Sequence, residues 1–176
     1  MKLQSDNMKL SEKTIALLKN FSSINQSILF KKGNVLRTMS VMKNILAEVD
    51  IEECFPQDFA IYDLVQFLNG ISLYSDPDLD FENESHLTIR EGRNHRTKYF
   101  FADPSVIVAP PEKSLTLPSE DVSFTIDTNN LTQLLKAAAV YQLSDLSVVG
   151  SNGAVKLVVR DKKNDSSNEF AIAVGE

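Results

Sequence analysis

The chain has 176 residues, of which 43% are hydrophobic and 24% charged, and its formal net charge at pH 7 is −6. This length fits one ordinary domain or two small ones, and the acidic balance argues against a protein that simply coats DNA. No apolar run approaches the roughly 18 residues of a membrane helix, and the start of the chain lacks the apolar core of a signal peptide.

Charge is distributed unevenly along the chain. Residues 1–50 carry eight Lys/Arg and four Asp/Glu, whereas residues 51–127 carry five and fifteen. A basic N-terminal third therefore belongs to a protein that is acidic overall. A second MKL begins at Met8, so we interpret residues 1–7 as an N-terminal extension.

Three segments repeat one helical pattern, at residues 11–21, 62–72 and 129–141. Apolar or weakly polar residues recur in them at i, i+3, i+4 and i+7, which is the stripe of a helix packed on one side. A residue suited to an N-cap stands near the start of each segment. The stripes are Thr14, Leu17, Leu18 and Phe21, then Leu64, Phe67, Leu68 and Ile71, then Leu131, Leu134, Leu135 and Ala138, with N-caps at Ser11, Asp63 and Asp127.

Strand-like segments follow each helix, and turn residues divide them into hairpins. Short strands are also expected before the second and third helices, at DFAIY (58–62) and SFTID (123–127), whereas the first helix lacks a clear leading strand. The expected turns are KKGN (31–34), Asn83-Glu84, Gly92-Arg93 and GSNG (150–153).

The second and third blocks align as a repeat, so the chain contains about three copies of a (β)αβββ repeat. One helix for each antiparallel sheet predicts an α+β fold. Two repeats form a two-helix, sheet-backed first domain over residues 8–103, and the third forms an incomplete second domain over 119–176. The aligned positions are Phe59, Ile61, Leu64, Gln66, Leu68, Leu79 and Phe81 with Phe124, Ile126, Leu131, Gln133, Leu135, Leu146 and Val148.

Residues 104–118 are expected to connect the two domains. Val106, Ile107 and Val108 lie between Pro104 and the pair Pro110-Pro111. Because proline removes backbone donors and biases the preceding residue towards extended geometry, this segment is predicted to be neither helix nor central strand. The three β-branched residues either all anchor the connector or divide between anchoring it and facing a partner.

The helix positions opposite the stripes carry lysines and amides although the chain is acidic, and only Glu12 lies near their centres. Lysine supplies charge without reading bases, which suits loose contact with phosphates. An ordinary solvated helix face is the alternative, and composition alone favours it because the lysines are few. The candidate residues are Lys9, Lys13, Lys19, Gln66, Asn69, Gln133 and Lys136.

No residue pattern indicates catalysis, a metal or a cofactor. His86 and His95 flank one hairpin turn, but no other ligand stands at a zinc-type spacing from them. Cys54 lacks basic neighbours that would lower its pKa, so a buried or partly buried inert thiol is expected. The chain is therefore interpreted as a binding or scaffolding protein rather than an enzyme.

Four motifs resemble one protein family, the DNA polymerase sliding clamps (processivity factors) of T-even-type bacteriophages and their marine relatives. The likeness runs from about Met8 to Glu176, and the first three motifs are long and correctly ordered. The motifs are MKLSEKTIALLKNFSSIN (8–25), DFAIYDLVQFLNGISL (58–73), ADPSVIVAP (102–110) and LTQLLKAA (131–138).

The resemblance implies a DNA-clamp fold and a head-to-tail trimeric ring around double-stranded DNA, with helices lining the hole. The candidate lysines and amides would then face DNA and permit sliding. The connector residues Val106, Ile107, Val108 and Pro110 would border a groove for short C-terminal peptides of the replicative polymerase and other partners, and a clamp loader would place the ring on DNA. No cofactor, metal or membrane is implied, and the location would be the cytoplasm of an infected bacterial host.

The sequence departs from the family in one respect, because family members carry two repeats in the second domain and this chain contains one. We therefore expect an exposed sheet edge or helix side in that domain, which would favour association. Either the chain is a fragment of a longer reading frame, or it assembles differently, as an interaction module that closes no ring.

Overall fold

A computed structural model describes residues 7–113, 116, 118–119, 122–151 and 153–175. The chain divides into two compact parts, Met1–Ser114 and Leu115–Glu176, called domain 1 and domain 2 below. The expected connector, residues 104–118, spans the boundary between them.

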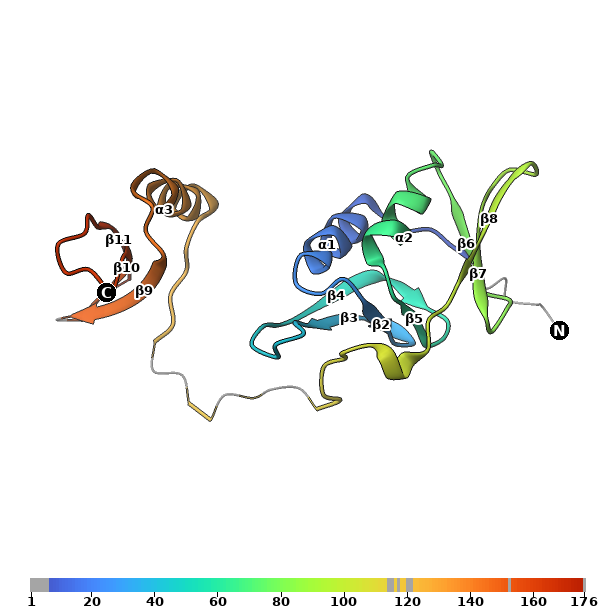
Figure 1. Ribbon diagram of the computed structural model, residues 1–176, viewed down its shortest axis with the longest axis horizontal. Helices are drawn as coiled ribbons and strands as arrows, with labels where there is room; N and C mark the ends of the chain where they lie inside the picture. Colours follow the sequence, from blue (N-terminus) through green and yellow to red (C-terminus); the bar gives the residue numbers. More distant parts are fainter. Residues whose placement is uncertain (1–6, 114–115, 117, 120–121, 152, 176) are drawn as a thin grey trace. The chain divides into compact units, whose positions relative to one another are not determined.

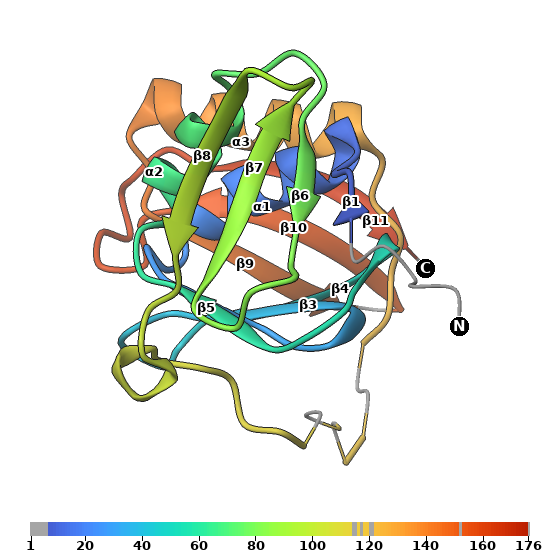
Figure 2. The same cartoon turned by 90° about the vertical axis from the view of Figure 1, so that its right-hand side faces the viewer.

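Domain 1 contains two helices and eight strands among its described residues. The two helices lie side by side, with β2–β5 below them and β6–β8 to their right in Figure 1, and the quarter-turned view of Figure 2 agrees. The elements are β1 (Asn7–Met8), α1 (Glu12–Ser22), β2 (Ile28–Phe30), β3 (Gly33–Met39), β4 (Leu46–Phe55), β5 (Phe59–Ile61), α2 (Leu64–Ile71), β6 (Asp78–Asp80), β7 (His86–Glu91) and β8 (His95–Phe100), with a 3₁₀ turn η1 at Pro104–Val106.

The two repeats of domain 1 exchange their leading strands. The strand that precedes α2, β5, pairs antiparallel with β2 of the first repeat. The strand that precedes α1, β1, pairs in return with β6 of the second repeat, which extends a sheet of order β1-β6-β7-β8. Hairpin β3–β4 forms a separate antiparallel pair. This reciprocal pairing, together with the α1–α2 contact, joins the repeats into one body.

The core of domain 1 is built from the predicted helix stripes and a group of phenylalanines. Leu18 of α1 and Leu64 of α2 are fully buried. Phe59 stacks on Phe30 with ring centroids 4.4 Å apart and meets Phe55 edge-on at 5.5 Å. Offset and edge-to-face aromatic pairs add to the free energy of burial. The phenylalanines thus connect strands from both repeats.

Domain 2 holds one helix and one antiparallel sheet among its described residues. Its buried core is small and consists of Leu134 of the helix packed against Leu157 and Val159 of the central strand. Gly153 forms the first hairpin turn with φ +81°, a conformation that favours glycine. The elements are α3 (Thr128–Tyr141), β9 (Asp145–Ser151), β10 (Ala154–Arg160) and β11 (Phe170–Gly175), in sheet order β11-β10-β9.

The α+β class, the three helices and their N-caps are confirmed, and four details of the prediction are wrong. KKGN joins β2 to β3, but these strands do not form a hairpin because each pairs with another strand. The segment 123–127 is not a strand. Asn7, placed in the extension, belongs to β1. Leu131 and Leu135, placed in the buried stripe of α3, are exposed.

Within the described part of the chain, no helix combines the length and the apolar character needed to cross a membrane.

Candidate nucleic-acid interface and connector groove

The start of α1 is fixed by a small hydrogen-bond network. The Ser11 side chain accepts from the backbone N–H of Thr14, an N-cap that satisfies one free donor of the first turn. Glu53 of β4 accepts from the Ser11 backbone N–H and from the Thr14 hydroxyl, the latter at 2.7 Å. Burial by itself would raise the pKa of Glu53, but these hydrogen bonds outweigh burial and hold the pKa below its ordinary value of 4.5.

This network predicts an acid-dependent contribution to stability. A carboxyl group whose pKa is lower in the folded state stabilises the fold above its unfolded pKa, and this stabilisation is lost as pH falls through the folded pKa. We expect Glu53→Gln to lower the melting temperature of domain 1 at pH 7, and the difference from wild type to shrink below pH 4.5. Calorimetric scans across pH check this, and a difference that is constant from pH 7 to pH 3 would contradict it.

All seven residues predicted to face DNA are exposed. Lys13 and Lys19 on α1 and Lys136 on α3 form no ion pair with any described residue. Their ammonium groups are therefore available to phosphates in solution. The placement of Lys9 on the first helix is wrong, because it lies before the N-cap and pairs with Asp76.

The amide candidates lie on the outer sides of their helices. Gln66 lies beside β8, where its side-chain oxygen is 3.5 Å from the Tyr99 hydroxyl, a weak contact. Asn69 on α2 and Gln133 on α3 are exposed. Gln66 and Asn69 thus belong to domain 1, and Gln133 belongs to domain 2.

The connector begins with a turn rather than in extended form. Asp103 caps η1 by accepting from the Ser105 N–H at 2.8 Å. Val106 is 56% exposed, whereas Ile107 is 8% exposed and packs inward. The Val108 carbonyl accepts from the side-chain amide of Asn25 at 3.3 Å.

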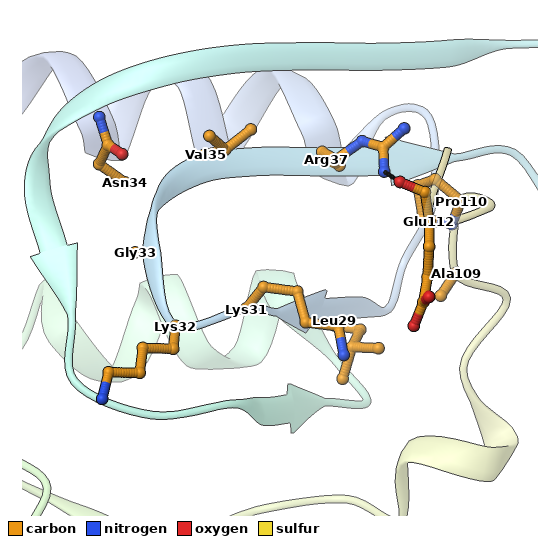
Figure 3. Close-up of a pocket in the computed structure, with 10 residues that line it drawn as sticks. All are labelled: Leu29, Lys31, Lys32, Gly33, Asn34, Val35, Arg37, Ala109, Pro110 and Glu112. Atoms are coloured by element: carbon orange, nitrogen blue, oxygen red, sulfur yellow. Dashed lines mark hydrogen bonds between the residues drawn. The ribbon is translucent and has the colours of Figure 1, made fainter. Parts of the chain in front are cut away.

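A cavity of about 380 Å³, called the connector groove below, lies between connector residues 109–112 and strands β2 and β3. Figure 3 shows Pro110 and Ala109 at one side of it and Gly33 and Asn34 at the other, and Leu29 and Val35 also line it. Of the four predicted connector residues, Pro110 lines this cavity, while Val106, Ile107 and Val108 do not. The remaining lining residues are Lys31, Lys32, Gly33, Asn34, Arg37 and Glu112.

Arg37 attaches the connector to β3. One guanidinium nitrogen donates to the Pro111 carbonyl at 2.8 Å and to the Glu112 carbonyl at 3.4 Å, the latter drawn in Figure 3. Its Nε lies 2.7 Å from the Glu48 carboxylate. Sequence reasoning missed both Arg37 and Asn25, because each acts across more than 70 residues of chain.

The tip of hairpin β3–β4 is a second feature that sequence reasoning missed. Val41, Met42 and Ile45 are exposed there. The Ser40 hydroxyl holds the loop by accepting from the backbone N–H groups of Asn44 and Ile45 at 3.2 and 3.1 Å. The tip is thus an ordered apolar group rather than a polar turn.

The two histidines and Cys54, the candidates for metal binding or catalysis, lie apart from one another. His86 pairs across the ladder with Phe100, and His95 pairs with Glu91 at the other end of hairpin β7–β8. Within the described ranges no three His, Cys, Asp or Glu side chains gather as metal ligands. The expectation of a buried Cys54 is wrong, because β4 alternates and Cys54 lies on its outer face.

Comparison with known proteins gives a consistent result. Residues 9–109 match the family described as DNA polymerase processivity factor. The sliding clamp of Vibrio phage KVP40 is 33% identical over 174 residues, which is 96% of this chain and 78% of that protein. The sliding clamp of Escherichia phage RB69 is 35% identical over 161 residues, or 90% of this chain and 69% of that protein.

Solved structures support the fold at lower sequence identity. PCNA from Thermococcus kodakaraensis gives a TM-score of 0.65 at 16% identity, covering 95% of this chain and 72% of that one. The DNA polymerase III subunit beta from Pseudomonas aeruginosa gives 0.58 at 12%, covering 96% and 53%. These likenesses show the clamp fold alone. The family match and the phage relatives show more: the chain belongs to the DNA polymerase processivity factors, the sliding clamps.

Proposed function

We propose that copies of this chain assemble around double-stranded DNA and hold the replicative polymerase of a T4-like phage on its template. The observation that carries the proposal is the family membership, together with lysines on α1 and α3 that form no ion pair with described residues. Contacts of this kind are weak and independent of sequence. DNA is then retained by topology rather than by affinity, which agrees with a net charge of −6.

The DNA-facing surface consists of Lys13, Lys19, Gln66, Asn69, Gln133 and Lys136 in this proposal. Lys9 contributes less, because Asp76 already neutralises its charge. Chemistry by the chain itself is not required, since tethering a polymerase raises its processivity without any catalytic group.

Open edge strands supply the means of assembly in this proposal. Within the described residues, β8 and β11 each have a ladder partner on one side only. Such edges accept a strand from another chain. We propose that head-to-tail contacts between copies use these edges, and that a trimeric ring, as the family resemblance implies, is the assembly to test.

The connector groove is proposed as the site for partner peptides. Its apolar lining of Leu29, Val35, Ala109 and Pro110 fits the hydrophobic C-terminal peptides of the polymerase and of clamp-loader partners. A connector held in place loses little entropy when a peptide docks beside it.

The cytoplasm of the infected bacterium, where phage replication takes place, is the proposed location.

Arg37→Ala should weaken peptide binding by about tenfold, since the connector loses hydrogen bonds from a charged donor and is no longer held in place. Fluorescence anisotropy with a labelled C-terminal polymerase peptide measures this. Arg93→Ala, at the exposed β7–β8 turn, is the matched control and should bind as wild type does. Equal affinities of wild type and Arg37→Ala for the peptide would show that the connector is not part of the binding site.

Primer extension on circular templates tests the function itself. With cognate polymerase and loader, the chain should lengthen the products made in a single binding event.

The second candidate is an interaction module that closes no ring, which the exposed helix side of domain 2 favours. In that case the chain would bind polymerase peptides but leave product length unchanged.

A further inference from the structure

A pocket of about 440 Å³ lies at the end of β8, where this strand meets the start of α2. Two of its lining residues are aromatic and exposed, since Tyr62 is 63% and Phe100 67% exposed. The Tyr99 hydroxyl donates to the Asp63 carbonyl at 3.1 Å and so fixes one wall. Exposed apolar groups gathered around a hollow mark an interaction surface. This pocket is called the β8 pocket below, and its other lining residues are Gln66, Lys98, Phe101 and Ala102.

The last turn of α3 presents two large side chains on the surface of domain 2. Val140 and Tyr141 are 73% and 50% exposed. Val140 follows Gln133 by about two helical turns, so these two residues lie on the same side of the helix. Gln133 corresponds to Gln66, which lies beside β8 in domain 1. Val140 therefore lies on the side of α3 next to β11, which is the counterpart of β8.

This side of the repeat is open in a complete domain as well. In domain 1, which contains two repeats, β8 has a ladder partner on one side only among the described residues, and Figure 2 shows it as the outer strand of its sheet. Leu73, which follows Gln66 as Val140 follows Gln133, is 78% exposed. The partner repeat covers the other side of α2, where α1 packs. The surface at Val140 and β11 therefore does not depend on a further repeat in domain 2.

We propose that the last turn of α3 inserts Val140 and Tyr141 into the β8 pocket of a neighbouring copy. This docking depends on the proposed head-to-tail pairing of β11 with β8, and it adds a side-chain anchor to that pairing of backbones. Strand pairing alone discriminates little between partners, whereas a filled pocket selects one. The contact joins different surfaces of the two copies, as head-to-tail assembly requires.

The strand order brings both surfaces to the same end of the interface. Three residues lead from α3 to Asp145, which pairs with Arg160 at the end of β10. Phe170, the first residue of β11, also pairs near the end of β10, so it lies at the same end of the sheet as the last turn of α3. In an antiparallel pair the start of β11 lies opposite the end of β8, where the β8 pocket is. A parallel pair would separate the two surfaces, so the docking also requires antiparallel pairing.

The faces and the charges of the two surfaces are compatible. Tyr99 of β8 packs on the core of domain 1 and Ile172 of β11 on that of domain 2, so a continuous sheet places both on its helix side. The pocket contains one acid, Asp63, and one base, Lys98, whereas residues 137–143 carry no charge. Tyrosine combines an apolar ring with a polar hydroxyl, which suits an aromatic pocket with polar groups in its lining.

Sedimentation velocity of the full chain tests the anchor. Wild type should form species heavier than the 19.6 kDa chain as concentration rises. Val140→Asn should weaken this association by about tenfold, because the pocket loses an apolar group and an amide would be buried without a partner. Val140 is exposed in the single chain, so the variant should fold as wild type does in circular dichroism.

Ala139→Asn is the matched control. Ala139 is also exposed in the last turn of α3, but it lies about 100° away around the helix. This variant should associate as wild type does. Equal association of wild type and Val140→Asn overturns the docking.

Cross-linking tests the contact itself. Cys54 is exposed, so the experiment uses a Cys54→Ser background. There, Tyr62→Cys combined with Val140→Cys should be joined between chains by a short bismaleimide. Tyr62→Cys combined with Leu135→Cys, on the other side of α3, should not.

The two readouts separate the docking from the assembly on which it depends. Association in sedimentation without a cross-link between positions 62 and 140 overturns the docking and leaves the head-to-tail pairing in place. A chain that stays monomeric at every concentration overturns both.

Discussion

Phe59→Ala should destabilise domain 1 by about 3–5 kcal/mol, the usual loss when a buried phenylalanine is truncated and the cavity does not close. Phe59 is 3% exposed and contacts the rings of Phe30, Phe55, Phe81 and Phe101. A single ring thus joins strands of both repeats. Denaturant unfolding monitored by circular dichroism measures the change in the free energy of unfolding.

Phe100→Ala provides the control for this prediction. Phe100 is exposed on the edge strand β8 and contacts the His86 ring. Its truncation should therefore alter the free energy of unfolding by less than about 1 kcal/mol. Equal losses for Phe59→Ala and Phe100→Ala would contradict the position of the core.

Reversing charge on the helix faces should have the largest functional effect. The triple variant Lys13→Glu, Lys19→Glu and Lys136→Glu replaces cations near phosphate with carboxylates, so we expect polymerase processivity to fall by more than about tenfold. Because fewer counterions are released, the remaining activity should also depend less on salt. Product length in single-binding-event primer extension, at several salt concentrations, measures both effects.

A matched triple variant separates position from net charge. Arg93→Glu, Lys162→Glu and Lys163→Glu change the charge by the same amount, at exposed turns away from the helix faces. This variant should retain processivity. Equal losses for the two triple variants would mean that total charge, rather than the helix faces, determines the effect.

Local chemistry made the helices predictable. Ser11, Asp63 and Asp127 each supply a side-chain acceptor one to four residues before the first residue of the apolar stripe, and each caps its helix as expected. The prediction that Leu131 and Leu135 of α3 are buried was wrong. Periodicity shows which side of a helix is apolar, whereas burial also requires another helix or strand that covers that side. Among the described residues, β9 has a ladder partner on one side only and these leucines are exposed, as expected of domain 2.

Contacts between distant segments were not predictable from local patterns. Arg37 reaches the connector and Glu53 reaches the start of α1, and neither residue stands in a motif that would indicate it. Strand β1 was not predicted, because a strand of two residues shows no periodicity and only its pairing with β6 defines it. The family was recognised from long motifs rather than from physical patterns, and that recognition is confirmed.

Retention on DNA tests the central claim most directly. The chain, in its assembled form and loaded onto nicked circular DNA by a cognate loader, should remain bound during gel filtration in high salt, because salt weakens phosphate contacts but does not open a ring. Cutting the circle once should then release it from the free ends. Salt-sensitive binding that is equal on circular and linear DNA would contradict a sliding clamp.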